Sequence, residues 1–437
     1  SYEIKIETES VSETIEINPL DQSDHTEIIQ SAIDRVLDNG LIIINEGIYH
    51  VKPLFLKSNI TILLKGTLLG STNRFDYPIL DEYLDNLPLG TWEGNVKKMF
   101  ASLITGIRVS NVKLVGPGSI NGNASNANWW INPKVTTPAA RPRTIYLNYC
   151  NNIQIAGIKV ENSPSWTIHP YYSDQLKFID LKIANPKDSP NTDGCNPESC
   201  HEVEIIGCRF SVGDDCIAIK SGKMEMVEKF YRPSSNITIR NCLMENGHGA
   251  VVLGSESSGG IRDLDVSNCI FINTDRGLRI KTRRGRGNKT VIDGIVFKNI
   301  TMKRVLNPFV INMFYFCDEE GKTDYVQSKL KAPVDERTPY IGKFTFQNIT
   351  CDESIISAGF FYGLPEAKIE KIVFKNVTIS MADTNEFGFP AMMNDIEKVN
   401  RLGLYFNNVK EIVLNNIIVQ NQIGPEIIAH NVDIIKK

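Results

Sequence analysis

Residues 236–246 have the sequence Asn-Ile-Thr-Ile-Arg-Asn-Cys-Leu-Met-Glu-Asn. Apolar and polar side chains alternate at its start, and a period of two is typical of a β-strand with one buried face. Asparagine ends the run at position 241, cysteine follows it, and a second short run begins. The stretch therefore predicts two strands joined at a tight turn.

The same unit recurs along most of the chain. Ten further runs share a four-residue pattern. A small or polar residue comes first, an apolar residue second, a polar or β-branched residue third and an apolar residue fourth. The runs begin at Asn59, Asn111, Asn152, Gln175, Glu202, Asp263, Gly294, Lys343, Lys371 and Glu411. Glycine or asparagine follows eight of the eleven runs at the same phase, at Gly157, Gly207, Asn241, Asn268, Asn299, Asn348, Asn376 and Asn416. Such repetition is typical of coils stacked about 4.8 Å apart. We therefore expect an all-β fold, a parallel β-helix, rather than a leucine-rich or propeller array, whose repeat motifs are missing.

Stacking also predicts the environment of two residue types. Asparagines on successive coils satisfy one another's amides at the turns. Cysteine follows the turn residue directly at Cys208, Cys242 and Cys269, so we expect a buried column of thiols. The nine cysteines show no short repeated spacing, which favours free buried thiols over a metal site.

The N-terminal region differs from the repeats. Asp24 and Glu27 have the spacing of a capping box, and apolar residues follow at helical intervals up to Val36. We expect Gly40 to end this helix. The predicted organisation is a strand and a short capping helix over residues 1–50, followed by one continuous β-helix domain over residues 51–437.

Composition excludes several classes of function. The chain has 47 Lys and Arg against 51 Asp and Glu, a formal charge of −4, which argues against a generally basic nucleic-acid or membrane-surface binder. No stretch approaches the roughly 20 apolar residues of a membrane helix. The chain begins at Ser1 without a charged and apolar leader, so we expect a processed or a recombinantly expressed chain from which any export signal has been removed.

Charged motifs fall at one phase on successive coils. They are Asn191-Thr-Asp193-Gly, Gly213-Asp214-Asp215-Cys, Gly247-His248-Gly and Arg279-Ile-Lys281. Each motif alone is more typical of a turn or a solvated strand face. Their common register instead predicts that three carboxylates, an imidazole and two cations converge on one stripe.

Crowded carboxylates favour acid–base hydrolysis. Their repulsion should raise at least one pKa enough to keep a proton near neutrality. Two carboxyl groups about 6.5 to 9.5 Å apart leave room for a water molecule and give inversion at an anomeric carbon. We expect about two coil spacings between the two groups.

The basic residues suggest the substrate. Six of them lie within eleven positions: Arg276, Arg279, Lys281, Arg283, Arg284 and Arg286. Nucleic acid is one partner for such a run, but no aromatic residues are interleaved, and the neighbouring carboxylates would repel phosphate. A carboxylated sugar fits better, with Arg279 and Lys281 binding the uronate.

The four motifs, in this order, resemble those of glycoside hydrolase family 28, the polygalacturonases, over about residues 20 to 430. The resemblance implies a right-handed parallel β-helix that hydrolyses α-1,4-linked galacturonic acid. It implies that Asp214 is the general acid and that Asp193 and Asp215 position and deprotonate water. His248 would hold the protonation and geometry of the acid.

The resemblance also implies binding residues. Arg279 and Lys281 would bind substrate together with Asn191, and Tyr315 is the nearest match to a tyrosine that the family uses. Trp166 and His169, like Trp129 and Trp130, lie on coils before the acids and are candidates for contact with sugars. The segment from Lys223 to Ser235 resembles the inserted loops of bacterial exo-acting members, which close one end of the groove.

We therefore expect an inverting exo-polygalacturonase that acts on pectic polysaccharide or oligosaccharide ends as a monomer. It would need no metal or organic cofactor and no nucleic-acid or membrane partner. A periplasmic or secreted bacterial location is favoured, with a cytoplasmic one open. The alternatives are a rhamnogalacturonan or xylogalacturonan hydrolase, a calcium-dependent pectate lyase, and a carbohydrate-binding β-helix.

Overall fold

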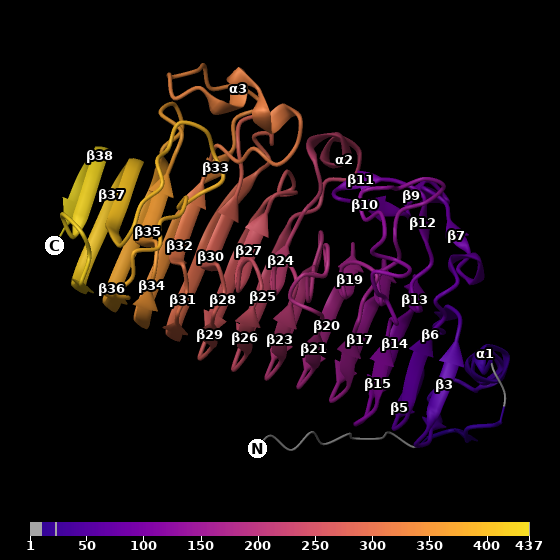
Figure 1. Ribbon diagram of the computed structural model, residues 1–437. Helices are drawn as coiled ribbons and strands as arrows, with labels where there is room; N and C mark the ends of the chain where they lie inside the picture. The colour runs from indigo at the N-terminus through magenta and orange to yellow at the C-terminus, as the bar shows by residue number, and fades with distance from the viewer. Residues whose placement is uncertain (1–10, 22–23, 437) are drawn as a thin grey trace.

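The computed structural model describes residues 11–21 and 24–436. In this part of the chain 28 strands form one continuous sheet that winds into a right-handed parallel β-helix (Figure 1). The predicted fold class is confirmed.

Three rows of parallel strands run along the β-helix. The first row contains all eleven predicted runs and consists of β5 (Ile60–Leu64), β14 (Ser110–Val115), β17 (Asn151–Ala156), β20 (Asp174–Ile179), β22 (His201–Ile206), β25 (Ser234–Arg240), β28 (Ile261–Ser267), β31 (Val291–Lys303), β34 (Lys343–Ser354), β36 (Ile369–Met381) and β37 (Leu402–Gln420). Each strand pairs in parallel with the next. The second row consists of β3 (Ile48–Val51), β6 (Thr67–Gly70), β15 (Ser119–Asn121), β18 (Lys159–Glu161), β21 (Lys182–Ala184), β23 (Arg209–Val212), β26 (Leu243–Asn246) and β29 (Ile270–Ile272), and it then merges into β31.

The third row carries the charged motifs. It consists of β4 (Leu54–Phe55), β13 (Ile104–Ile107), β16 (Ile145–Asn148), β19 (Ile168–Tyr171), β24 (Ile217–Ile219), β27 (Val251–Gly254), β30 (Arg276–Lys281), β32 (Asn307–Asn312) and β35 (Ser357–Tyr362), and it ends on β37 and β38 (Ile427–Lys436). Between β19 and β24 the coil keeps its register through bridges at Cys195 and Glu198.

Asparagine side chains form the predicted ladder at one turn. Nδ2 of Asn299, Asn348, Asn376 and Asn416 donates to Oδ1 of the asparagine one coil earlier, at 3.0–3.1 Å. These residues have φ between +53° and +56°, a left-handed conformation that asparagine tolerates better than most residues. Cys208, Cys242 and Cys269 follow this turn and are buried free thiols, as predicted, whereas Cys317 is exposed.

The N-terminal helix covers the first coils. Helix α1 (Thr26–Arg35) buries Ile29, Ala32 and Ile33 against them. The predicted cap is wrong in detail, because Asp24 Oδ1 accepts from the backbone N–H of Thr26 at 2.9 Å instead of that of Glu27. The helix also ends before Gly40.

Gly40 instead begins β2 (Gly40–Ile44). Glycine is needed there because a Cβ atom would lie 2.3 Å from Cγ2 of Val36. β2 pairs with β1 (Thr14–Ile17) and with β5, and β3 pairs with β6, so strands on both sides of residue 50 belong to the same sheet. The division of the chain at residue 50 stays a proposal.

Two groups of loops rise above the third row (Figure 1). The first holds the 3₁₀ helix Arg74–Asp76, β7 (Ile79–Leu80), β8 (Tyr83–Leu84), β9 (Leu87–Pro88), β10 (Thr91–Trp92), β11 (Asn95–Val96), β12 (Met99–Phe100) and α2 (Met224–Lys229). The second holds the 3₁₀ helix Glu320–Lys322, α3 (Asp324–Gln327) and β33 (Tyr340–Ile341). No helix in the described ranges combines the length and apolar character that a membrane span requires.

Candidate active site

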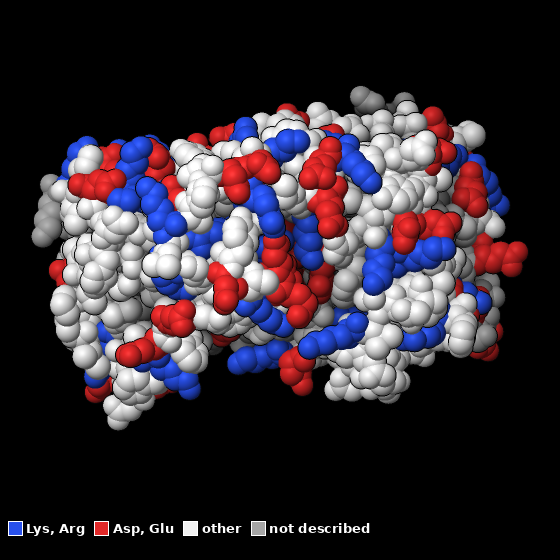
Figure 2. Space-filling view, turned by 90° about the horizontal axis from the view of Figure 1, so that it is seen from above, with Lys and Arg blue, Asp and Glu red and all other residues white. Residues whose placement is uncertain are grey.

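Three carboxylates meet just before the strands of the third row. Asp193, Asp214 and Asp215 each offer an oxygen within 4.8 Å of the others. Asp193 and Asp215 lie at matching positions of neighbouring coils, because Gly194 N–H donates to Asp215 O at 3.0 Å. Figure 2 shows acidic and basic side chains crowded together near the middle of this face. The expected separation of two coil spacings is therefore wrong, since one spacing separates these carboxylates.

Asp193 lies in a setting that favours its protonated form. Its side chain is buried, and burial outweighs the hydrogen bond that Asn196 Nδ2 donates to Asp193 Oδ2 at 2.8 Å, which favours the ionised form. Burial raises the pKa of Asp193, and the nearby charge of Asp214 raises it further. The direction of this shift is the one expected for a carboxyl group that keeps a proton.

Asp215 lies in the opposite setting. Burial alone would raise its pKa, but Lys281 and Arg279 outweigh burial and lower the pKa of Asp215 below its usual value. Lys281 Nζ lies 2.7 Å from Asp215 Oδ2, and Arg279 Nη1 lies 3.5 Å from Oδ1. These cations therefore favour the ionised form of Asp215, one coil away from Asp193, whose pKa is raised.

His248 contacts the third carboxylate. Its Nδ1 lies 3.3 Å from Asp214 Oδ1, and its backbone N–H donates to Asp214 O at 3.0 Å. The side-chain contact with Asp214 raises the pKa of His248. Both side chains remain accessible, at 53% for His248 and 25% for Asp214. The structure thus brings together the four predicted catalytic residues.

Only part of the predicted basic run faces the acids. Arg279 and Lys281 also lie 5.9 and 5.8 Å from the ring centre of Tyr315, which places the predicted tyrosine beside them. Three other members form ion pairs elsewhere, Arg283 with Asp318 and Glu320, Arg284 with Glu366, and Arg286 with Asp318. These three arginines hold loops in place and are not available to a substrate.

Asn191 lies at the edge of the cluster, partly exposed. Its Oδ1 accepts from Arg141 Nη2 at 2.6 Å. Arg141 is 3% exposed and was not identified from the sequence, because it lies in an irregular segment outside the repeat. Arg141 thus fixes the Asn191 side chain, and a role of Asn191 in substrate binding stays a prediction.

Trp166 and His169 do not lie where the prediction needs them. Trp166 is 4% exposed and His169 is fully buried, so neither presents a face to a sugar. Trp129 and Trp130 are buried as well. The physical reason is the first group of loops, whose Trp92 stacks on Trp166 at 6.4 Å between ring centres.

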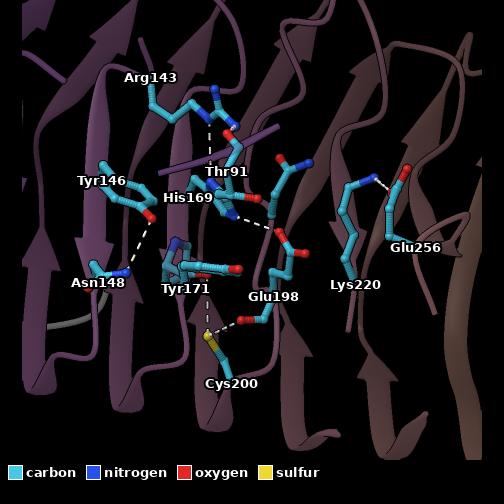
Figure 3. Close-up of polar contacts among 12 residues, drawn as sticks. Thr91, Arg143, Tyr146, Asn148, His169, Tyr171, Glu198, Cys200, Lys220 and Glu256 are labelled. Atoms are coloured by element: carbon cyan, nitrogen blue, oxygen red, sulfur yellow. Dashed lines mark hydrogen bonds and ion pairs between the residues drawn. The ribbon is translucent and has the colours of Figure 1, made fainter. Parts of the chain in front are cut away.

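A buried polar network extends from this point (Figure 3). Arg143 Nε donates to His169 Nδ1 at 3.3 Å, and His169 Nε2 lies 3.0 Å from Glu198 Oε2. Burial and the charge of Arg143 lower the pKa of His169, so the imidazole is neutral and donates to Glu198. One coil further, Lys220 Nζ lies 2.6 Å from Glu256 Oε2. Sequence analysis missed this network, because nothing in one sequence pairs residues across such distances.

Residues 223–235, the inserted segment, and the loop around Gly94 form a wall on the N-terminal side of the acids. Lys223 N–H donates to Gly94 O at 3.4 Å, which joins this segment to the first group of loops. Tyr172 Oη donates to Phe230 O at 2.8 Å, which ties the segment to the coil below.

The acid cluster suits proton transfer better than metal binding. Asp193, Asp214 and Asp215 are the one group in the described residues close enough to ligate a metal ion. Lys281 and Arg279 already neutralise Asp215, however, and burial raises the pKa of Asp193. A protonated carboxyl group beside an ionised one is the pair that general acid–base hydrolysis requires.

Comparisons with known proteins agree with this geometry. The sequence model of glycosyl hydrolases family 28 matches residues 46–386. A probable polygalacturonase of Vitis vinifera is 32% identical over 75% of this chain and 64% of its own length. An exo-poly-alpha-D-galacturonosidase of Dickeya chrysanthemi is 27% identical over 76% of this chain and 60% of its own length. An endo-polygalacturonase of Pectobacterium carotovorum is 29% identical over 68% of this chain and 73% of its own length. The chain thus spans less than two thirds of the first two relatives.

Solved structures share the fold. The exopolygalacturonase of Thermotoga maritima superposes with a TM-score of 0.71 at 25% identity and covers 93% of this chain and 92% of its own. The family 28 exopolygalacturonase of Yersinia enterocolitica gives a TM-score of 0.78 at 20% identity, over 97% of this chain and 78% of its own.

Proposed function

The chain belongs to glycosyl hydrolases family 28, and from this premise we propose that it is an exo-polygalacturonase that releases galacturonic acid from the ends of α-1,4-linked pectic chains. The observation that carries the proposal is the contrast between two buried carboxyl groups on neighbouring coils. Asp193 favours its protonated form, and Asp215 is held ionised by Lys281 and Arg279. We further propose one catalytic domain over residues 51–437 that acts as a monomer.

Asp214 is assigned as the general acid because it is the most accessible of the three carboxyl groups and contacts His248. After Asp214 protonates the leaving oxygen, a charged His248 stabilises the carboxylate that remains.

Asp193 and Asp215 are assigned to position the attacking water, and the ionised Asp215 is assigned to deprotonate it. Oδ1 of Asp215 is buried and accepts no hydrogen bond from the described residues. A water molecule bound there would satisfy this oxygen and face the sugar. Asp193 borders the same position from the neighbouring coil.

A uronate substrate agrees with the cations beside the acids. Arg279 and Lys281 can donate to a sugar carboxylate next to the cleaved bond, with Asn191 and Tyr315 at the edges of the same site. Buried guanidinium and ammonium groups favour such charged partners strongly.

Exo action is supported by the wall on the N-terminal side. Residues 223–235 and the loop around Gly94 are joined there by a hydrogen bond between Lys223 N–H and Gly94 O, and together they would limit the length of chain that extends past the acids. The most similar bacterial members would then be the exo-acting ones.

Inversion is proposed from the family resemblance. Each of the three carboxyl groups has an oxygen within 4.8 Å of an oxygen of the others, which is closer than the 6.5–9.5 Å typical of inverting acid and base pairs, so this contact alone does not support it. Proton NMR of the first product gives the anomer directly. Release of β-galacturonic acid from the α-linked substrate is expected, and the α-anomer would contradict inversion.

Product analysis on polygalacturonate tests the whole proposal. We expect galacturonic acid alone from the earliest time points, and an initial ladder of oligomers would contradict exo action. An unsaturated product that absorbs in the ultraviolet and is lost on adding chelator would instead indicate a lyase. No release from a panel of pectic polymers would favour a carbohydrate-binding protein.

A further inference from the structure

The side chains in line with Arg279 become apolar on the next two coils. Arg279 of β30 pairs with Val310 of β32, and Val310 pairs with Phe360 of β35. Val310 and Phe360 are buried, at 2% and 4% exposed. Neither β32 nor β35 contains a lysine or an arginine. The cations beside the acids therefore have no equivalent on the two strands that follow β30.

Residues 382–400, between β36 and β37, lie over this part of the third row. Asn312, at the end of β32, donates from its Nδ2 to Met392 O at 2.9 Å. Backbone hydrogen bonds in both directions between Gly388 and Val399 brace the segment internally. The segment is therefore held against the coil that follows β30.

A second segment, residues 313–339, is joined to the first. Gln327 of α3 is 4% exposed, its Oε1 accepts from the backbone N–H of Asn394 at 2.8 Å, and its Nε2 donates to Phe314 O at 2.6 Å. One buried side chain thus ties the two segments together. We call residues 313–339 and 382–400 the C-terminal cover. Figure 1 shows it rising above the third row near β32 and β35.

Met392 is the part of the cover that borders the acid site. Its Sδ lies 2.9 Å from Arg279 Nη2, and Nη1 of the same arginine lies 3.5 Å from Asp215 Oδ1. Only one guanidinium group therefore separates the thioether from the carboxylate. Met392 is partly exposed, whereas its neighbours Ala391 and Met393 are each 4% exposed and belong to the core. The Met392 side chain thus lies at the edge of the groove, next to a proposed substrate-binding residue.

The exposed surface of residues 382–400 is acidic. Asp383 pairs with Arg401 at 3.2 Å. Of the other exposed charged side chains in this segment, three are carboxylates and one is an ammonium group: Glu386, Asp395, Glu397 and Lys398. A polyuronate that passes over the cover is therefore repelled, whereas a chain of a few sugars that ends before the cover is not.

We propose that the enzyme prefers short oligogalacturonides to long polygalacturonate, because the C-terminal cover ends the groove beside Arg279. Met392 is the residue that sets this limit. The inference rests on the proposed function and makes it more specific, since it concerns the length of the chain and not the identity of the sugar.

The physical reason is that the acids lie between two obstructions. The wall formed by residues 223–235 and the loop around Gly94 lies on the N-terminal side, and the cover lies on the C-terminal side. A short chain fits between them. The end of a polymer reaches the acids only if the rest of the chain turns away from the surface, which costs contacts and brings its carboxylates past the acidic cover. Polymer ends are thus cleaved, but more slowly.

Chain length is the first measurement. The value of kcat/KM is determined per chain end on trigalacturonic acid and on long polygalacturonate at low ionic strength. We expect the polymer value to be about 10-fold or more lower, the equivalent of about 1.4 kcal/mol of lost contacts and repulsion. The same comparison at high salt should narrow the difference, because salt screens the carboxylates of the cover.

Substitution of Met392 tests the limit itself. Met392→Ala shortens the side chain beside Arg279 and should raise the ratio of the polymer value to the trimer value by about threefold or more. Met392→Leu keeps the bulk and should retain the ratio of the parent. Leu37→Ala, at the opposite end of the β-helix, removes an exposed apolar side chain of similar size and should leave the ratio unchanged. Thermal unfolding checks the fold of each variant.

The charge of the cover is tested separately. Asp395→Asn combined with Glu397→Gln removes two charges and keeps the bulk, and it should raise the same ratio about twofold or more at low salt. Asp180→Asn combined with Glu202→Gln removes two exposed carboxylates beside the first row of strands and should leave the ratio unchanged.

Equal values per chain end on the trimer and the polymer would overturn the inference and leave exo action intact. A Met392→Ala variant that lowers both values by the same factor would show a structural role and overturn the part assigned to Met392. Failure of the parent protein to cleave either substrate would overturn the proposed function itself.

Discussion

Lys281 reaches back across two coils from β30 to Asp215, where its Nζ lies 2.7 Å from Oδ2. The carboxylate is 1% exposed and the lysine 10%, so water screens the pair very little. Arg279 adds a second cation at 3.5 Å. The ionisation state of Asp215 is therefore set by residues that are 64 and 66 positions away in sequence but on nearby coils.

Replacing Lys281 by methionine should raise the pKa of Asp215, because burial then opposes ionisation with only Arg279 left to counter it. The acid limb of the kcat–pH profile should move to higher pH, and kcat should fall most at the acid end. The profile is measured on polygalacturonate. Lys298→Met removes an exposed ion pair with Asp265 and should leave the limb in place. An unshifted limb in Lys281→Met would show that the lysine does not control Asp215.

Asp214→Asn removes the proposed proton donor and keeps its shape. We expect kcat to fall about 10²-fold or more, which is the range that general acid catalysis contributes. The melting temperature should change little, because this side chain is partly exposed. Near-full activity in the folded variant would exclude Asp214 as the acid.

The raised pKa of Asp193 predicts how the stability of the protein changes with pH. Its pKa is higher in the folded protein than in the unfolded chain, so the folded state holds a proton that the unfolded state has lost between the two values. Stability therefore falls as the pH rises through this window. Asp193→Asn removes the titrating group, and its gain in melting temperature over the parent should be larger at pH 7 than at pH 4. An equal change at both pH values would contradict the raised pKa.

The strands and the asparagine ladder were predictable because they repeat. Each run from Asn59 to Glu411 has the same phase, and the phase alone identifies the stacked positions. The convergence of Asp193, Asp214 and Asp215 followed from the same register. The repeat did not predict the number of coils between these carboxylates. The segments between the motifs differ in length, so the sequence does not show whether two positions lie one coil or two coils apart.

Burial of Trp166 and His169 was not predictable for a different reason. His169 lies on β19 and Trp166 lies just before it, on a face that is normally exposed in a β-helix. They are covered here by the loop that carries Trp92, which has no periodic pattern to indicate where it packs. The pairing of Lys220 with Glu256 was hidden for the same reason, since a single sequence contains no signal for contacts between irregular segments.

The asparagine ladder should contribute measurably to stability. Asn348 donates to Asn299 and accepts from Asn376, and its φ is +53°. Asn348→Ala loses both contacts and adds about 1–2 kcal/mol for a left-handed alanine, so the free energy of unfolding should fall by about 2 kcal/mol. Asn348→Gly loses the contacts but tolerates the conformation, and it should cost less. Denaturant titration measures both, and equal losses would show that backbone conformation is not involved.

Arg284 tests whether the basic run serves structure or substrate. It contacts both oxygens of Glu366, and the two side chains are 2% and 1% exposed. Arg284→Met leaves a buried carboxylate unpaired and should lower the free energy of unfolding by about 3–5 kcal/mol. Replacing Glu366 by methionine as well removes the unpaired charge and should recover much of that loss. If the Arg284→Met variant instead is as stable as the parent and has a higher KM for polygalacturonate, the arginine binds substrate. Other contacts would then hold the loops in place.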